Sequence, residues 1–265
     1  DKGFVSESWM AMVHTPVKDW QKKEDARKAV DKEWDKLADK KAWILESVRE
    51  YEDVSKEATS KGKTVSFGDL MRLCHVKHSE LAEKYHSFKG RVVFRGDNVR
   101  DESGHLAVFS EQGTSASHLA AAKFLDAIAR MPENDGQDSD ATGAYTQAEH
   151  AGAETWVHLP RDKWPKGWHN KYTKPVVRLR LNLYGHPLAG LFWEQHCSKA
   201  ILQCGFEAVT GWECLYKHNK EQLFLSVYVD DFKMAGNKNN LSNMWKRLGA
   251  LLDIDTPTAF RENVY

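Results

Sequence analysis

The chain has 265 residues, of which 41% are hydrophobic and ten are Trp, so it can bury the core of one large domain or two smaller ones. Lys and Arg together number 38, and so do Asp and Glu. These values exclude a disordered chain, and they exclude an overall positive charge as the basis of any nucleic-acid binding.

No apolar run approaches the roughly 20 residues that a membrane-spanning helix needs, and the first ten letters, DKGFVSESWM, do not follow the order of a signal peptide. The four cysteines form no CxxC pair, which favours reduced thiols inside a cell over a disulfide framework. The sequence begins without Met and ends without an evident closing element. We therefore expect a fragment of a longer intracellular protein that does not enter a membrane.

The first third of the chain predicts two helices and a strand. Residues 17–41 place apolar side chains near helical spacing amid dense mixed charge, which indicates an amphipathic helix. Residues 42–48 indicate a strand, and the polar residues 55–64 indicate a loop. Residues 66–83 predict a helix, because Ser66 is a suitable N-cap and helix formers follow it.

The middle of the chain predicts a basic strand, a helix and an irregular segment. Residues 88–97, FKGRVVFRGD, combine β-branched and aromatic residues with several cations, which indicates a strand with a basic face. Residues 117–131 predict a helix with Ser117 as its N-cap. Turn formers and acids at 133–140 break the pattern, and residues 155–160 then indicate a strand.

The last third predicts strands and helices in mixed order. The expected strands cover residues 176–184, 213–219, 222–229 and 232–236, and the expected helices cover residues 191–205 and 240–253. Because strands and helices do not alternate strictly, we expect an α+β fold and not a doubly wound sheet.

Two adjacent carboxylates, Asp230 and Asp231, follow an apolar strand. Val229 and Asp230 fall where a two-residue hairpin connection would lie, so Asp230 is expected at the tip of two buried strands. Neighbouring like charges repel and are costly near a core unless a positive charge lies between them. A solvated turn and a bound Mg²⁺ ion, which prefers oxygen ligands, both remain open at this point.

The Tyr-x-Asp-Asp box between apolar strands resembles the catalytic hairpin of reverse transcriptases. The ordered runs VVRLRLNLYGHPLAGLFWEQH, GFEAV, CLYKHN and LFLSVYVDDFKMAG are similar to the corresponding part of copia-type LTR retrotransposon polymerases. KGRVVFRGD resembles the basic fingers strand of that family, and DATGAYTQAE with ETWVHLP resembles its first catalytic motif and the strand after it. The resemblance extends from about residue 25 to about residue 253.

The resemblance implies the fingers and palm of a reverse transcriptase, with an antiparallel palm sheet whose catalytic β-hairpin packs on helices. It places the N-terminal helix and fingers region in residues 1–132. It places the palm, interleaved with the fingers, in residues 133–265 and predicts that the chain stops before the thumb and ribonuclease H.

The resemblance also implies a metal site for Mg²⁺, or Mn²⁺, made by Asp140, Asp230 and Asp231. Asp135 and Asp138 lie close to Asp140, which is chosen because Tyr145 stands five positions after it, where the family has an aromatic residue. Tyr145 is then expected to act as a steric gate against the 2′-hydroxyl of a ribonucleotide; an ordinary core Tyr is the alternative.

The remaining expected contacts of the site are with phosphates and bases. The resemblance implies nucleotide binding by Lys89, Arg91 and Gly190, and nucleic-acid binding by Arg95, Arg178, Arg180 and Tyr228. For the cations, a solvated strand face is the alternative, and for Gly190 the alternative is the start of a helix.

The resemblance therefore predicts an RNA-directed DNA polymerase that joins a dNTP to a primer 3′-hydroxyl on an RNA or DNA template. It implies a transposable element that integrates its DNA, a Pol polyprotein with ribonuclease H and integrase, and an intracellular location in a cytoplasmic particle or the nucleus. A catalytically decayed or domesticated palm that binds nucleic acid or another protein is the alternative, favoured by the apolar run HPLAGLF. A Mg²⁺-dependent phosphohydrolase is a third possibility.

Overall fold

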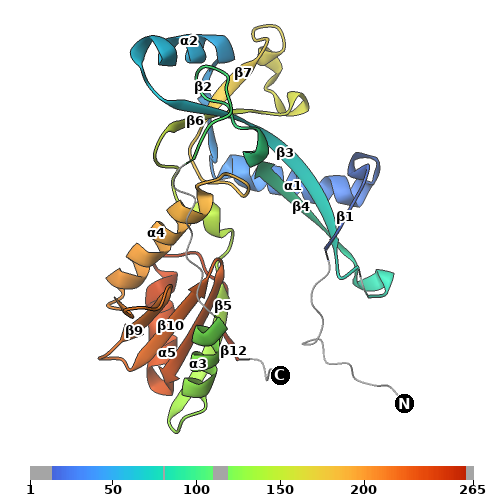
Figure 1. The fold of residues 1–265 in the computed structure, drawn as a ribbon. Helices are drawn as coiled ribbons and strands as arrows, with labels where there is room; N and C mark the ends of the chain where they lie inside the picture. Colours follow the sequence, from blue (N-terminus) through green and yellow to red (C-terminus); the bar gives the residue numbers. More distant parts are fainter. Residues whose placement is uncertain (1–13, 80, 110–118, 261–265) are drawn as a thin grey trace. The chain divides into compact units, whose positions relative to one another are not determined.

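The computed structural model describes residues 14–79, 81–109 and 119–260. The chain divides into two compact units. Unit 1 comprises Asp1–Ser110 and Glu149–Ala189, and unit 2 comprises Glu111–Ala148 and Gly190–Tyr265. Each unit is therefore built from two separate segments of the sequence. Figure 1 shows the fold coloured along the chain.

The strands described in unit 1 form a six-stranded sheet in the order β1-β3-β6-β7-β2, with β4 paired to β3. The bounds are β1 His14–Pro16, β2 Trp43–Glu50, β3 Val65–Lys77, β4 Ser87–Phe94, β6 Glu154–His158 and β7 Pro175–Leu179. All pairs are antiparallel except β3 with β6. Helices α1 Glu24–Asp39 and α2 Tyr51–Lys61 complete the unit (Figure 1), with short 3₁₀ turns at Trp20–Lys22, Glu83–Tyr85, Gly96–Asn98, Arg161–Lys163 and Lys166–Trp168.

Helix α1 confirms the amphipathic helix expected from the charge pattern. Its buried residues are Ala26, Val30, Trp34 and Leu37, which lie on one face at helical spacing. Ala26 and Val30 pack with Cys74 of β3, and Trp34 and Leu37 join the main core of unit 1. The helix also approaches β4 so closely that a Cβ on Gly90 would lie within 3.0 Å of the backbone of α1.

The predicted loop at 55–64 is wrong, because α2 continues through most of it to Lys61. Val54 and Ala58, one helical turn apart, are both buried. Gly62 follows the helix with φ 59°, the left-handed conformation that closes many helices and that glycine adopts without strain. This helix was not predicted because its residues are mostly polar and its apolar face is narrow.

The predicted helix at 66–83 is also wrong, because residues 65–77 form the long strand β3. This strand pairs with β6 over residues 65–69, with β4 over residues 70–77 and with β1 over residues 75–77, so partners distant in sequence bond its backbone along its whole length. Residues such as Leu70 and Met71 favour helices in isolation, but the tertiary pairing overrides that preference.

The strands described in unit 2 form an antiparallel six-stranded sheet in the order β12-β5-β11-β10-β9-β8. The bounds are β5 Asn134–Asp140, β8 Glu207–Ala208, β9 Leu215–His218, β10 Leu223–Tyr228, β11 Asp231–Asn237 and β12 Thr258–Ala259. The helices are α3 Leu119–Ala129, α4 Ala189–Gln203 and α5 Lys238–Gly249, and a 3₁₀ turn covers Ala144–Gln147. The predicted helix near 117–131 is confirmed as α3, while Ser117 lies outside the described residues.

Alternation along β11 gives the sheet of unit 2 two apolar faces. Phe232 and Met234 share a buried cluster with residues of α4 and α5, including Ile201. Ala235, on the opposite face, packs with Leu125 of α3. The sheet therefore lies between α4 and α5 on one side and α3 on the other, and its β10–β11 hairpin is supported from both faces.

The irregular segment predicted at 133–140 is wrong, because Asn134–Asp140 forms β5 between β11 and β12. The ring of Phe260 lies where a Cβ on Gly136 would be, within 3.0 Å, so the glycine provides the space for a packing contact. Ser139 is buried, and its hydroxyl donates a hydrogen bond to the Asp255 carbonyl oxygen at 2.7 Å. This strand is made largely of polar residues, and it forms because of backbone pairing and contacts with residues distant in the sequence.

The elements thus confirm a mixed fold of sheets and helices, as expected for a reverse transcriptase domain. Among the described helices, none combines the length and the hydropathy that crossing a membrane requires.

Candidate active site

The β10–β11 hairpin carries the adjacent carboxylates on a two-residue turn, as predicted. Tyr228 pairs with Asp231, so Val229 and Asp230 form the connection. Val229 has φ 58°, a conformation that a β-branched residue rarely adopts and that costs about 1–3 kcal/mol. Two hydrogen bonds secure the turn: the Trp193 indole Nε1 donates to the Val229 carbonyl at 2.6 Å, and the Ala141 amide donates to the Asp230 carbonyl at 2.7 Å.

Asp140 is the final residue of β5 and stands directly opposite Asp231 in the antiparallel register. The three predicted carboxylates, Asp140, Asp230 and Asp231, are therefore brought together at one end of one sheet. Asp135, a rival for the third position, pairs with Gly236 near the other end of β5, and its carboxylate accepts a hydrogen bond from the Gly136 amide.

The electrostatics of Asp231 reflect this crowding of negative charge. Its pKa is raised from 3.8 to about 6, first by partial burial of the carboxyl group and then by the charge of Asp230. The charge of Asp140, a side-chain hydrogen bond with Asp140 and the charge of Asp138 raise it further. Asp138 pairs across the sheet with Lys233, whose ammonium group forms an ion pair with Asp126 at 2.5 Å.

The donor set fits a hard divalent cation, because Mg²⁺ and Mn²⁺ prefer carboxylate oxygens and a cation would offset the charge that raises the pKa of Asp231. In the part of the chain that the structure describes, no three His, Cys, Asp or Glu side chains are arranged so that they could hold a metal ion as they stand. The backbone register gathers the three aspartates, whereas the closing of their side chains around a metal stays a prediction.

Tyr145 lies in the 3₁₀ turn that follows Asp140 and is half-buried against the core of unit 2. Burial raises the pKa of its hydroxyl, and the negative charge of Asp230 raises it further. Tyr145 is thus close enough to the hairpin tip to be affected by its charge. Its role as a sugar gate stays a prediction.

Two other predicted residues lie in unit 2. Tyr228 ends β10 beside the turn, and 54% of its surface is exposed, so its ring is available to a ligand. Gly190 is the second residue of α4. Their contacts with nucleic acid and nucleotide stay predictions.

Lys89 and Arg91 lie on β4 of unit 1, two residues apart and thus on one face of the strand. Burial lowers the pKa of Lys89, and the positive charges of Arg91 and Lys77 lower it further. The Arg91 guanidinium lies over the ring of Tyr184, 5.2 Å from the centroid. This basic face exists as predicted, while its phosphate contacts stay predictions.

The other predicted cations of unit 1 have partners within the chain. Arg95 donates two hydrogen bonds to the Asp97 carboxylate, at 3.0 and 3.3 Å. Arg178 forms an ion pair with Glu154 at 2.8 Å. Arg180 donates to the carbonyl oxygens of Lys40 and Lys41 just after α1, and it also pairs with Glu149. Arg180 thus has a structural role, and nucleic-acid binding by all three stays a prediction.

Sequence reasoning missed the residues that hold the aspartates in place. Asp255, 115 positions after Asp140, donates its amide to the Asp140 carbonyl at 2.8 Å, and its carboxylate accepts a hydrogen bond from Thr142 at 3.0 Å. No local pattern at Asp255 signals this contact. Trp193 could have been noticed as a large residue of the WEQH run, but its hydrogen bond to the turn could not.

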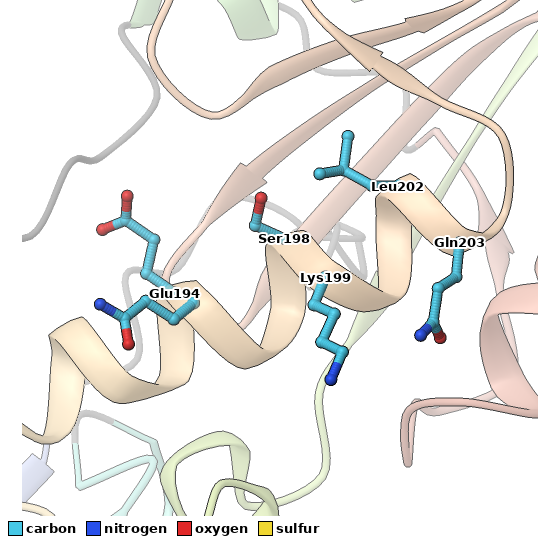
Figure 2. Close-up of a pocket in the computed structure, with 6 residues that line it drawn as sticks. Glu194, Ser198, Lys199, Leu202 and Gln203 are labelled. Carbon is cyan, nitrogen blue, oxygen red and sulfur yellow. The ribbon is translucent and has the colours of Figure 1, made fainter. Parts of the chain in front are cut away.

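An open depression of about 610 Å³ lies along α4 in unit 2 (Figure 2). Its lining residues are Glu194, Gln195, Ser198, Lys199, Leu202 and Gln203. None of the predicted site residues lines it, so its size does not identify it as the active site.

The chain is similar to one known protein family and to several yeast polyproteins. The family described as "Reverse transcriptase (RNA-dependent DNA polymerase)" matches residues 70–257, which include all three aspartates. The chain is 28% identical over 158 residues to the Transposon Ty1-BL and Ty1-DR4 Gag-Pol polyproteins of Saccharomyces cerevisiae, a match that covers 58% of this chain. It is 27% identical over 146 residues, 54% of the chain, to the truncated transposon Ty1-A Gag-Pol polyprotein of the same yeast.

The matched regions make up 8%, 9% and 11% of the three relatives, so the chain corresponds to a small part of a long polyprotein. The family match covers most of the chain and includes the aspartate hairpin, the strand β5 that pairs with it, and helix α4, which lies between β5 and the hairpin in the sequence. The chain therefore belongs to the reverse transcriptase (RNA-dependent DNA polymerase) family of nucleotidyltransferases, as a domain of the copia type of retrotransposon.

Proposed function

We propose that the chain is the fingers and palm of a copia-type reverse transcriptase, which extends a primer on an RNA or DNA template. In this reaction the primer 3′-hydroxyl attacks the α-phosphate of a dNTP and pyrophosphate leaves. The N-terminal helix and fingers would come from residues 1–132, and the palm, interleaved with the fingers, from residues 133–265. The observation that supports the proposal most directly is the register of Asp140 opposite Asp231, with Asp230 on the adjoining turn.

Asp140, Asp230 and Asp231 would hold two Mg²⁺ ions, or Mn²⁺. When bound, such ions activate the attacking oxygen and stabilise the leaving oxygens of a phosphoryl transfer. The protein's own contribution is to hold Asp140 and Asp231 opposite each other on paired strands and Asp230 on the turn that joins β10 to β11.

The aromatic and basic residues would select and orient the nucleotide. Tyr145, near Asp230, would exclude the 2′-hydroxyl of a ribonucleotide. Lys89 and Arg91 would neutralise the triphosphate, and Gly190 would allow close approach of the nucleotide. Arg95, Arg178, Arg180 and Tyr228 would contact the template-primer.

The cellular context is part of the same proposal. The relatives are Gag-Pol polyproteins, and the chain matches about a tenth of their length or less. We place this domain in a Pol polyprotein with ribonuclease H and integrase, acting in an intracellular particle or the nucleus before the DNA copy is integrated.

Primer extension by the Asp230→Asn variant tests the assignment. With poly(rA) template, oligo(dT) primer and Mg²⁺, we expect loss of extension by roughly 10³-fold or more, because Asn keeps the shape but lacks the charge that holds the cation. Asp35→Asn, which removes an exposed carboxylate from α1, should leave the rate unchanged. Extension that survives Asp230→Asn would contradict the two-metal assignment.

A second function, nucleic-acid binding without catalysis, is favoured by the environment of the run HPLAGLF. His186 is the one polar side chain of this run, and it is only 4% exposed, so it does not present its imidazole to a template. Binding of labelled primer-template, with a normal melting curve and no extension over hours, would support this second function over the first.

A further inference from the structure

The turn that carries Asp230 depends on a side chain from another element. Trp193 belongs to α4 and is 2% exposed, within the apolar core of unit 2. Its indole Nε1 donates to the carbonyl oxygen of Val229, 36 residues later in the chain, at 2.6 Å. A buried donor that meets its acceptor at this distance fixes both groups.

The acceptor residue needs such a contact because its conformation is unfavourable. Val229 has φ 58°, where Gly or Asn is the usual residue of a two-residue hairpin turn. Val is stiff and branched at Cβ, so this turn would relax toward negative φ if nothing opposed the change. The peptide that would rotate contains the Val229 carbonyl and leads directly into Asp230.

The next carbonyl of the turn is held by a residue from the end of β5. The Asp230 carbonyl accepts the amide of Ala141 at 2.7 Å, and Ala141 directly follows Asp140. Movement of the Val229 peptide would therefore disturb both Asp230 and its link to the strand end that carries Asp140.

We propose that Trp193 is a positioning residue for the aspartate site: its indole N–H keeps Val229 in the left-handed conformation and thereby sets the direction of Asp230 toward Asp140 and Asp231. The link to metal binding rests on the proposed function. The holding of the turn does not, and it can be measured without a metal or a substrate.

The test compares Trp193→Phe with Trp245→Phe. Trp245 lies on α5 in the same core and is 4% exposed, and its Nε1 has no hydrogen-bond partner among the described residues. Both substitutions trim a buried indole to a phenyl ring, but only the first removes a hydrogen bond to the turn. Similar losses of melting temperature are expected for both variants.

The direct readout is hydrogen exchange of the Ala141 amide, followed by NMR without metal. We expect roughly tenfold faster exchange in Trp193→Phe and less than about twofold change in Trp245→Phe, as loss of one hydrogen bond to the turn predicts. Adding Val229→Gly to Trp193→Phe should return exchange to within about twofold of the parent, because Gly adopts positive φ without strain. Equal exchange in the two Trp variants, or no recovery with Gly, would overturn the proposal.

The second readout is the Mg²⁺ concentration for half-maximal binding in calorimetry and for half-maximal primer extension. We expect a rise of about tenfold in Trp193→Phe with little change in KM for dNTP, since misplaced ligands weaken a metal site. Altered exchange with unchanged Mg²⁺ dependence would overturn the positioning role. A parent chain that neither binds Mg²⁺ nor extends a primer would contradict the proposed function, while the exchange data would still decide whether Trp193 holds the turn.

Discussion

Asp231 is the residue at which the charge of the site can be measured directly. Its pKa is raised to about 6 in the folded protein, so folding favours the protonated form. This contribution to stability is fully present below the unfolded value of 3.8 and is lost as the pH rises through about 6. Above that pH, Asp231 is ionised in the folded chain without metal, and its charge lowers the free energy of unfolding.

Asp231→Asn should therefore stabilise the metal-free chain at high pH and lose that advantage in acid. We expect the difference in free energy of unfolding between variant and parent to be larger at about pH 8 than at about pH 4, in chemical denaturation without divalent ions. Asp35→Asn on α1 is the control and should show no such trend. A difference that is independent of pH would mean that Asp231 is not perturbed.

Adding Mg²⁺ at about pH 8 should reverse the order of stability, because a cation that binds only the folded parent stabilises it by mass action. The midpoint of denaturation of the parent should rise with Mg²⁺ concentration, while that of Asp231→Asn should change little. Equal shifts in both proteins would indicate that Mg²⁺ binds elsewhere.

At the scale of elements, α1 and β4 are packed too closely for any side chain at Gly90. A Cβ there would lie within 3.0 Å of backbone atoms of Ala29 and Val30, which cannot rotate away. We expect Gly90→Ala to lower the free energy of unfolding by about 1–3 kcal/mol, the usual cost of overpacking. Gly167→Ala is the control in the same denaturation experiment, because a Cβ at Gly167 would meet no neighbouring atom within 4 Å. A neutral Gly90→Ala would mean that the helix can move off the strand.

The predictions of helices and strands are right where the stabilising contacts are local in the sequence and wrong where those contacts come from distant residues. Helix α1 and the β10–β11 hairpin are recognisable because their apolar spacing and turn are local in sequence. Strands β3 and β5 are not recognisable from the sequence, because the residues of β3 favour a helix and those of β5 favour a turn. Pairing with strands distant in the sequence makes both segments extended. The candidate site follows the same rule: its aspartates belong to short motifs, whereas Trp193 and Asp255 reach them from far along the chain.

At the scale of the whole molecule, charge is balanced, with 38 basic and 38 acidic residues. A neutral chain has no strong long-range field to attract nucleic acid, so affinity must come from local groups such as the β4 face of Lys89 and Arg91. Arg91 is suited to this role because Tyr184 supports its guanidinium 5.2 Å from the ring centroid, which orders the side chain before a phosphate binds.

The salt dependence of binding distinguishes such a local contact from a general effect of charge. Each phosphate contact contributes about 0.7–0.9 to the slope of log K against log salt, so Arg91→Gln should reduce the slope for a primer-template by about that amount. Arg27→Gln removes the same charge from the exposed face of α1 and should leave the slope unchanged. The slopes come from fluorescence anisotropy titrations at several salt concentrations. Equal reductions in the two variants would assign the effect to net charge, whereas a reduction confined to Arg91 would place a phosphate on the β4 face.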